Sequence, residues 1–138
     1  GGNAVSFKER VGASAWAGEI AFTIEERTAE RVVGRMPVTA AMLNPYGTVH
    51  AGAMIWFADV VATQCAVGDF DALEESGRGF PLAVDLHTVL LANQGDGVLQ
   101  ATATPVRRGG TLSVIRTEVR GRDDRLLIEM TTTHLRAK

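Results

Sequence analysis

The longest run of hydrophobic positions in the chain begins after Gly47 and ends before Gly68. About eighteen residues bounded by turn-forming residues are too many for one strand and are typical of a helix. The preceding segment, residues 44–47 (N-P-Y-G), consists of residue types that favour a turn. Hydrophobic residues fall on every side of this helix, which predicts that it is buried all round.

Strict alternation of hydrophobic and polar positions predicts a strand over residues 19–25. Its hydrophobic residues Ile20, Phe22 and Ile24 would share one face of the strand. A second hydrophobic run at residues 31–37 follows after a short polar turn. The two runs predict a β-hairpin that precedes the helix.

The chain after the helix has the pattern of β-structure, following a glycine-rich and acidic loop at residues 68–80. Glycine-containing turns separate the hydrophobic runs, and such turns commonly connect adjacent antiparallel strands. We therefore expect an antiparallel meander in which each strand pairs with the next. The four expected strands are residues 82–91, 98–106, 111–120 and 125–135.

One hydrophobic helix and five or six strands predict an α+β fold, formed by a single domain over residues 1–138. A curled antiparallel sheet would cover most of the helix. Residues 1–17 are expected to form an N-terminal extension, in which Gly1-Gly2 are candidates for residues left by cloning. Because a curled sheet leaves exposed edges, the fold also predicts pairing with a second copy of the chain.

Composition excludes several classes of partner. The 46% hydrophobic and 22% charged residues are ordinary for a globular protein, and the net charge of −2 gives no sign of a nucleic-acid or membrane partner. The single cysteine, Cys65, rules out an internal disulfide and favours a reducing, cytoplasmic location. Its position in the hydrophobic helix predicts a buried and unreactive thiol.

Asp59 is the one carboxylate inside the hydrophobic helix, where an unpaired charge costs several kcal/mol. Thr63 lies four residues later and therefore on the same helical face. At the start of the helix, near His50, the first backbone N–H groups lack intrahelical partners and suit an oxygen that becomes an anion. These features favour acyl transfer, although a structural aspartate that is bonded to a neighbouring strand explains Asp59 as well.

The segment 44–52 (N-P-Y-G-T-V-H-A-G), followed by Asp59, resembles the hotdog-fold thioesterases, in particular their phenylacetic-acid-pathway and 4-hydroxybenzoyl-CoA thioesterase branch. The stretches V-D-L-H-T-V-L-L, G-D-G-V-L and V-R-R-G-G-T also resemble strands of that family. The resemblance extends over residues 18–135 and implies a hotdog fold, in which the sheet wraps the central helix.

The resemblance also implies catalytic roles for four residues. Asp59 would be the catalytic carboxylate, as a nucleophile or as the base that activates water. The backbone N–H of Ala51 would polarise the thioester carbonyl, although the family usually has glycine at this position. Asn44 would bind the carbonyl or the water, and Thr63 would position the water.

Substrate binding is implied for two other places in the chain. His50 and Gly52 would form the helix start beside the thioester, and His50 would support the helix rather than transfer protons. Arg107 and Arg108 would meet the phosphates of coenzyme A, although a solvated basic turn explains this pair equally well.

The function that the resemblance implies is hydrolysis of an acyl-CoA thioester without metal or bound cofactor, in a homodimer or homotetramer with its sites between subunits. His87 and His134 have no metal-binding spacing with Cys65. Two alternatives stay open: an acyl-CoA-binding protein without activity, and a hydratase or dehydratase. The second would require a histidine paired with the acid, whereas His50 and Asp59 are nine residues apart and point in different directions on a helix.

Overall fold

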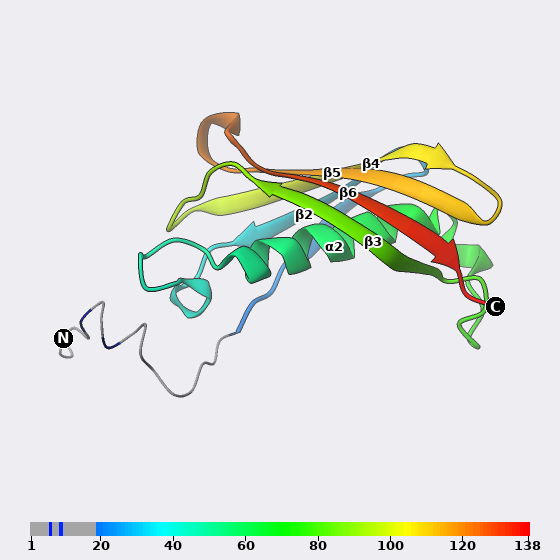
Figure 1. The fold of residues 1–138 in the computed structure, drawn as a ribbon, viewed down its shortest axis with the longest axis horizontal. Coiled ribbons are helices and arrows are strands. Elements are labelled where there is room, and N and C mark those ends of the chain that lie inside the picture. Colours follow the sequence, from blue (N-terminus) through cyan, green and yellow to red (C-terminus); the bar gives the residue numbers. More distant parts are fainter. Residues whose placement is uncertain (1–5, 7–8, 10–18) are drawn as a thin grey trace.

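A computed structural model describes Ser6, Glu9 and residues 19–138, so most of the predicted N-terminal extension lies outside the described residues. One long helix packs against a curved six-stranded sheet (Figure 1), which confirms the predicted α+β fold. The helix α2 spans Ala51–Val67, as the hydrophobic run predicts. The strands are β1 (Thr23–Arg27), β2 (Val32–Pro37), β3 (Pro81–Leu90), β4 (Val98–Arg108), β5 (Leu112–Arg120) and β6 (Leu126–Arg136), with short 3-10 turns at Ala40–Met42, Phe70–Ala72 and Arg122–Asp124.

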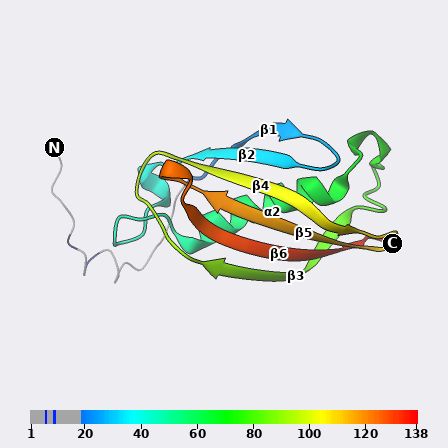
Figure 2. The same ribbon diagram turned by 90° about the horizontal axis from the view of Figure 1, so that it is seen from above.

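The strands follow the order β1-β2-β4-β5-β6-β3, and every neighbouring pair is antiparallel (Figure 2). The predicted meander is right for β4, β5 and β6 but wrong for β3, which pairs with β6 instead of β4. The reason is that β2 occupies the free side of β4, from Val32 opposite Ala103 to Pro37 opposite Val98. Residues 91–97 therefore cross the end of the sheet instead of closing a hairpin.

The predicted N-terminal hairpin is confirmed as β1 and β2, although regular pairing in β1 begins at Thr23. Ile20 and Phe22, which precede that pairing, pack against the hydrophobic core. The ring of Phe22 lies 5.0 Å from that of Phe57 on the helix. The alternating pattern thus identifies the inward face correctly, even where the backbone does not pair.

Helix and sheet approach closely at Gly34 in β2. A Cβ atom at this position would lie 2.8 Å from Val61 and 3.0 Å from the ring of Phe57, so only glycine fits without displacement. Phe57 and Val61 are fully buried and face β2. This contact fixes the rotation of α2 about its axis, and with it the direction in which Asp59 points.

The helix ends at Gly68, whose φ of 72° suits glycine. Arg108 from β4 donates to the Cys65 carbonyl oxygen at 2.8 Å and to that of Ala29 at 2.6 Å. Its charge offsets the negative end of the helix dipole. Cys65 is buried as predicted, and burial raises the pKa of its thiol.

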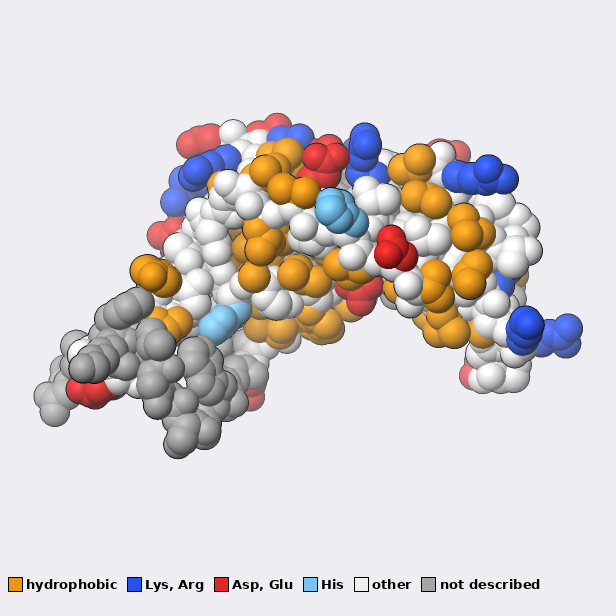
Figure 3. Space-filling model, viewed as in Figure 1, with side chains coloured by type: hydrophobic (Ala, Val, Ile, Leu, Met, Phe, Trp, Pro, Cys, Tyr) orange, Lys and Arg blue, Asp and Glu red, His pale blue; other side chains and the backbone are white. Residues whose placement is uncertain are grey.

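The prediction that α2 is buried all round is wrong for a single chain. The sheet covers one side of the helix, but Gly52 is exposed, Trp56 is 38% exposed, and Asp59 and Thr63 are only half-buried. The sheet is open and shallow, so it cannot reach around the helix. The uncovered side of the helix faces away from the sheet. Figure 3, which views the molecule from the side of β3, shows hydrophobic side chains gathered on that face.

Candidate active site

The start of α2 presents two backbone N–H groups, of Ala51 and Gly52, that no described residue pairs with. The His50 carbonyl accepts from the N–H groups of Ala53 at 3.0 Å and Met54 at 3.2 Å, so it points into the helix. Since the C=O and N–H of one trans peptide point in opposite directions, the Ala51 N–H points out of the helix. No described residue accepts from the N–H of Ala51 or Gly52. The helix dipole favours negative charge at this end.

The described residues leave space beside these donors. Among them, nothing lies within 4 Å of where a Cβ atom at Gly52 would be. The described part of the chain therefore leaves room for a ligand on this side of the helix start. The predicted position of Gly52 beside a substrate fits this geometry.

Asn44 builds the turn that leads to the helix. Its side-chain oxygen accepts from the N–H of Tyr46 at 2.9 Å and from that of Thr48 at 3.2 Å, as in an Asx turn. Its amide nitrogen donates to the hydroxyl of Thr48 at 3.0 Å. An amide nitrogen has two N–H bonds, so one donor is left for a ligand.

Two residues that the sequence analysis did not single out hold this turn in place. Asn93 bonds the backbone of Val49, and Gly95 lies so close to the Gly47 carbonyl oxygen that a Cβ atom there would collide with it. Residues 93–97 were interpreted as a hairpin turn, and no spacing in the sequence relates them to residues 47–49. Only the fold shows this contact.

Asp59 lies on the open side of the helix. It follows Phe57 by two residues, about 200° around the helix at 3.6 residues per turn, and so faces away from β2. Thr63 follows one turn later on the same side, as predicted, whereas Gln64 points to β1 and accepts from Arg27 at 2.6 Å. Within the described part of the chain, no hydrogen bond or ion pair involves the Asp59 carboxylate.

The structure brings the predicted residues together in two groups instead of one. Asn44, His50, Ala51 and Gly52 surround the helix start, and Asp59 and Thr63 lie further along the helix. Eight residues at 1.5 Å each separate Ala51 from Asp59 by about 12 Å along the axis, and the Ala51 N–H points away from Asp59. The two groups of one chain cannot both contact one thioester carbonyl.

His134 on β6 is fully buried near Asp59, and both of its ring nitrogens have partners. Nδ1 lies 3.3 Å from the Pro81 carbonyl oxygen and Nε2 lies 2.8 Å from the Thr132 hydroxyl. Because a carbonyl only accepts, Nδ1 carries the proton and Nε2 accepts from Thr132. Burial lowers the pKa of His134, against smaller opposing effects of the Pro81 carbonyl and the Asp59 charge. A neutral, fully bonded ring is a structural group.

The two predicted phosphate-binding arginines lie at the other end of α2. Arg108 is bonded to backbone carbonyls there, as described above. Arg107 is exposed beside a β-bulge of β4 and forms no ion pair with a described carboxylate. The length of the helix, 17 residues, places both about 25 Å from the Ala51 N–H of the same chain.

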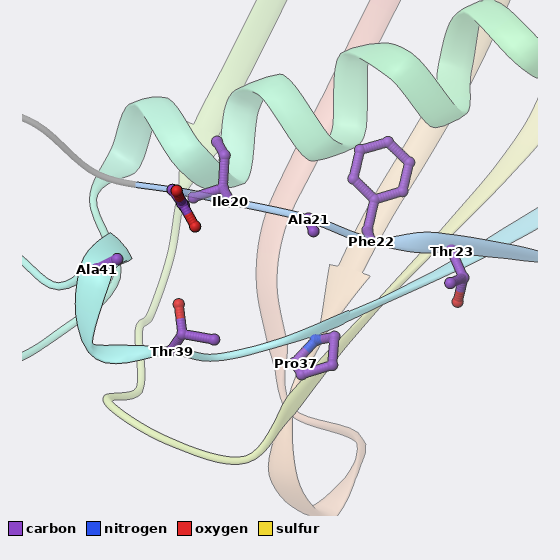
Figure 4. Close-up of a pocket in the computed structure, with 8 residues that line it drawn as sticks. Ile20, Ala21, Phe22, Thr23, Pro37, Thr39 and Ala41 are labelled. Carbon is purple, nitrogen blue, oxygen red and sulfur yellow. The ribbon is translucent and has the colours of Figure 1, made fainter.

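A groove of about 460 Å³ lies beside β1 and the segment after β2 (Figure 4). Ile20 and Phe22 line it and point toward the helix, and Phe22 packs against Trp56 and Phe57. None of the predicted site residues lines the groove. It does not belong to the candidate site.

Comparison with known proteins supports a common family. No family model matches the chain. The Bacillus subtilis (strain 168) protein named "Putative esterase ComA2" is 30% identical over 104 residues, which cover 75% of this chain and 79% of that protein. A thioesterase of Staphylococcus aureus, SAV0944, has a similar structure, with a TM-score of 0.76 and 23% identity over 85% of this chain and 93% of that chain. The chain belongs to the hotdog-fold thioesterase family.

Two further structures agree with this assignment. AziG of S. sahachiroi is 28% identical with a TM-score of 0.73, over 85% of this chain and 92% of that chain. A hypothetical thioesterase protein of Streptococcus pneumoniae TIGR4, solved with coenzyme A, is 20% identical with a TM-score of 0.72, over 86% and 89% of the two chains. The hotdog fold predicted from residues 44–59 is thus confirmed. None of the described helices is long and apolar enough to cross a membrane.

Proposed function

We propose that this protein hydrolyses acyl-CoA thioesters with Asp59 as the catalytic carboxylate, in sites that are each built from two chains. The observation that carries the proposal is the Asp59 carboxylate itself. It lies on a hydrophobic helix, on the side that the chain leaves open, and no described residue pairs with it. Because no described residue occupies its oxygens, the carboxylate can accept a proton from water or attack a substrate carbon.

In the reaction, the thioester carbonyl oxygen accepts from the Ala51 N–H, with Gly52 and the remaining Asn44 N–H close by. Asp59 removes a proton from a water held by Thr63, and the resulting hydroxide adds to the carbonyl carbon. Negative charge develops on the carbonyl oxygen, where the helix start stabilises it. The C–S bond then breaks, the coenzyme A thiolate leaves, and it takes up the proton that Asp59 removed from the water, which regenerates the carboxylate. Direct attack by Asp59 would form an anhydride that water cleaves in a second step.

The separation of about 12 Å between Ala51 and Asp59 supports a site shared by two chains. The carboxylate of one chain would act on a carbonyl that the Ala51 N–H of a second chain holds. Such an arrangement arises when two copies of α2 lie side by side and antiparallel. A two-fold axis next to the open side of the helix produces this geometry.

The exposed edge strand β3 supports a two-fold axis on the same side of the molecule. β3 is an edge strand of ten residues, and its exposed hydrophobic side chains include Val84 at 56% and Leu90 at 51%. A long hydrophobic edge is a template for pairing with another strand. The opposite edge, β1, has only five residues, and the charged Glu25, Glu26 and Arg27 among them discourage pairing. We infer a homodimer joined through β3, which brings the open sides of the two helices together.

Two relatives lend support to these roles. In the S. aureus thioesterase, a glutamine and a glutamate that are 15 positions apart have each been replaced by alanine. Asn44 and Asp59 have the same separation in this chain and the same kinds of side chain, an amide and a carboxylate. The S. pneumoniae structure contains coenzyme A, which supports coenzyme A as the leaving group.

For the phosphates of coenzyme A we propose Arg107, whose guanidinium is exposed and not ion-paired with a described carboxylate. Arg108 would add positive charge, although its bonds to Cys65 and Ala29 limit its freedom. In an antiparallel pair of helices, the C-terminal end of one α2 extends past the start of the other, so this arginine pair would lie beyond the reacting carbonyl.

His134 does not supply the histidine that a hydratase or dehydratase would need. A hydratase requires a histidine that can exchange a proton beside the carboxylate. His134 is near Asp59, but it is buried and both of its nitrogens are bonded.

A panel of aryl-, short-chain and long-chain acyl-CoAs, followed by release of the free thiol, tests the activity. We expect hydrolysis of at least one class with turnover in the range of ordinary enzymes, about 1 to 1,000 per second. Binding of acyl-CoA without thiol release from any member would contradict the proposal and favour the binding-protein alternative.

Val84→Lys is expected to convert the protein to a monomer and to abolish hydrolysis, because it replaces an exposed hydrophobic side chain of the β3 edge with a charge. Light scattering at micromolar concentration, together with the thiol-release assay, measures both effects. Val98→Lys is the matched control, since Val98 is a partly exposed valine on β4. An active monomeric Val84→Lys variant would refute a site shared by two chains.

A further inference from the structure

The side chain of Asn93 makes three hydrogen bonds, two of them to the backbone of Val49, which lies just before the helix. Its amide nitrogen donates to the Val49 carbonyl oxygen at 2.6 Å. Its side-chain oxygen accepts from the N–H of Val49 at 3.2 Å and from that of Gln94 at 2.8 Å. An asparagine that bonds both the C=O and the N–H of one residue fixes the orientation of that residue's backbone.

The peptide group between Val49 and His50 is held from both sides. Asn93 holds its C=O, and the His50 N–H donates to the Met42 carbonyl oxygen at 2.9 Å. The next peptide group along the chain, from His50 to Ala51, carries the N–H that points out of the helix. Only the backbone torsions of His50 lie between the group that Asn93 holds and the Ala51 donor.

Asn93 itself is attached to the sheet. Leu91 and Ala92 both donate to the Leu127 carbonyl oxygen of β6, at 2.8 and 3.3 Å. Gly95 lies against the Gly47 carbonyl oxygen without room for a side chain. These contacts attach the helix start to the sheet through Asn93, so its position does not depend on the loop alone.

We propose that Asn93 is a positioning residue for the Ala51 N–H, which it aims at the carbonyl oxygen through the Val49–His50 peptide group. The inference rests on the proposed function, because it concerns the residue that orients the oxyanion donor of that site. A donor in an oxyanion site acts only when it is correctly directed, and a displacement of about 1 Å can cost about a hundredfold in rate. Asn93 does not touch the substrate in this account.

Asn93→Ala removes all three bonds, and Asn93→Asp removes only the donor to the Val49 carbonyl. We expect both variants to lower kcat about 10- to 100-fold while KM stays within about threefold, because the misdirected donor matters most in the transition state. Asn93→Asp keeps the acceptor and still loses activity if the bond to the Val49 carbonyl is the important one. A purely structural role would lower the amount of folded protein without this division between kcat and KM.

Gln94→Ala is the matched control. Gln94 is the next residue of the same loop and bonds the N–H of Arg122 and the carbonyl of Asp96, but its side chain does not bond the helix start. We expect its kcat to stay within about twofold of the wild type. Equal losses of kcat in Asn93→Ala and Gln94→Ala would overturn the proposal, and so would wild-type kcat in folded Asn93→Ala.

A second measurement does not depend on activity. Amide NMR shifts of Ala51 and Gly52 are expected to change in Asn93→Ala and to stay unchanged in Gln94→Ala. Unchanged shifts in both variants would contradict the positioning role even if the protein hydrolysed no thioester. Absence of hydrolysis by the wild type, with changed shifts in Asn93→Ala, would instead reject the proposed function alone.

Discussion

Asp59→Asn is expected to fold, to bind acyl-CoA and to lose at least about a hundredfold in turnover, as expected when a general base is deleted. Asparagine keeps the size of the side chain and its hydrogen-bonding capacity but removes its basicity and nucleophilicity. Single-turnover hydrolysis of a good acyl-CoA substrate measures the loss, and circular dichroism verifies the fold.

Two further variants test whether the loss of turnover is specific to the Asp59 carboxylate. Thr63→Ala should lose less, because a water can be held by its remaining partners. Asp123→Asn makes the same chemical change in an exposed turn whose positive φ suits asparagine, and it should leave turnover unchanged. A folded Asp59→Asn variant with the wild-type rate would make Asp59 a structural residue and the mechanism wrong.

Ala51→Pro is expected to lose about 100- to 1,000-fold in kcat, because proline removes one backbone donor from the oxyanion site. The helix should tolerate the change, since Ala51 is the first helical residue, where proline is favoured. His50, with φ −54° and ψ 134°, already has a conformation that suits a residue before proline. Thiol release under saturating substrate gives kcat, and thermal unfolding verifies stability.

Ala51→Gly is the control for this position. Glycine keeps the N–H and removes the Cβ, so turnover should stay within about tenfold of the wild type, or roughly 1.4 kcal/mol. Full activity in a folded Ala51→Pro variant would show that another group polarises the carbonyl.

The helix and its carboxylate could be predicted from the sequence because both depend on local pattern. A hydrophobic run between two glycines defines α2, and a single acid within it stands out. The position of β3 could not be predicted in this way. Its connection, residues 93–97, has the composition of a hairpin turn, and only the competing pairing of β2 with β4 excludes a hairpin. Pairing between strands distant in sequence leaves no local signal.

The site shows a similar division. The residues at the helix start and Asp59 were identified from the motif, and the family resemblance implied sites between subunits. The rise of 1.5 Å per residue over the eight positions from Ala51 to Asp59 agrees with that expectation, because it keeps the two apart within one chain. Asn93 had no such signal, since it lies 44 residues from Val49. The open side of α2 likewise depends on how far the sheet curves.

The most direct measurement of the two-chain site combines the two inactive variants, Asp59→Asn and Ala51→Pro, in one mixed protein. In a mixed dimer, one site contains both substitutions, and the other contains an intact Asp59 and an intact Ala51 N–H. Random reassembly from equal amounts should therefore restore about a quarter of the wild-type activity per chain, since half of the dimers are mixed and each has one intact site. If the activity stays at the average of the two separate variants while light scattering shows mixed dimers, each site belongs to one chain and the account is contradicted.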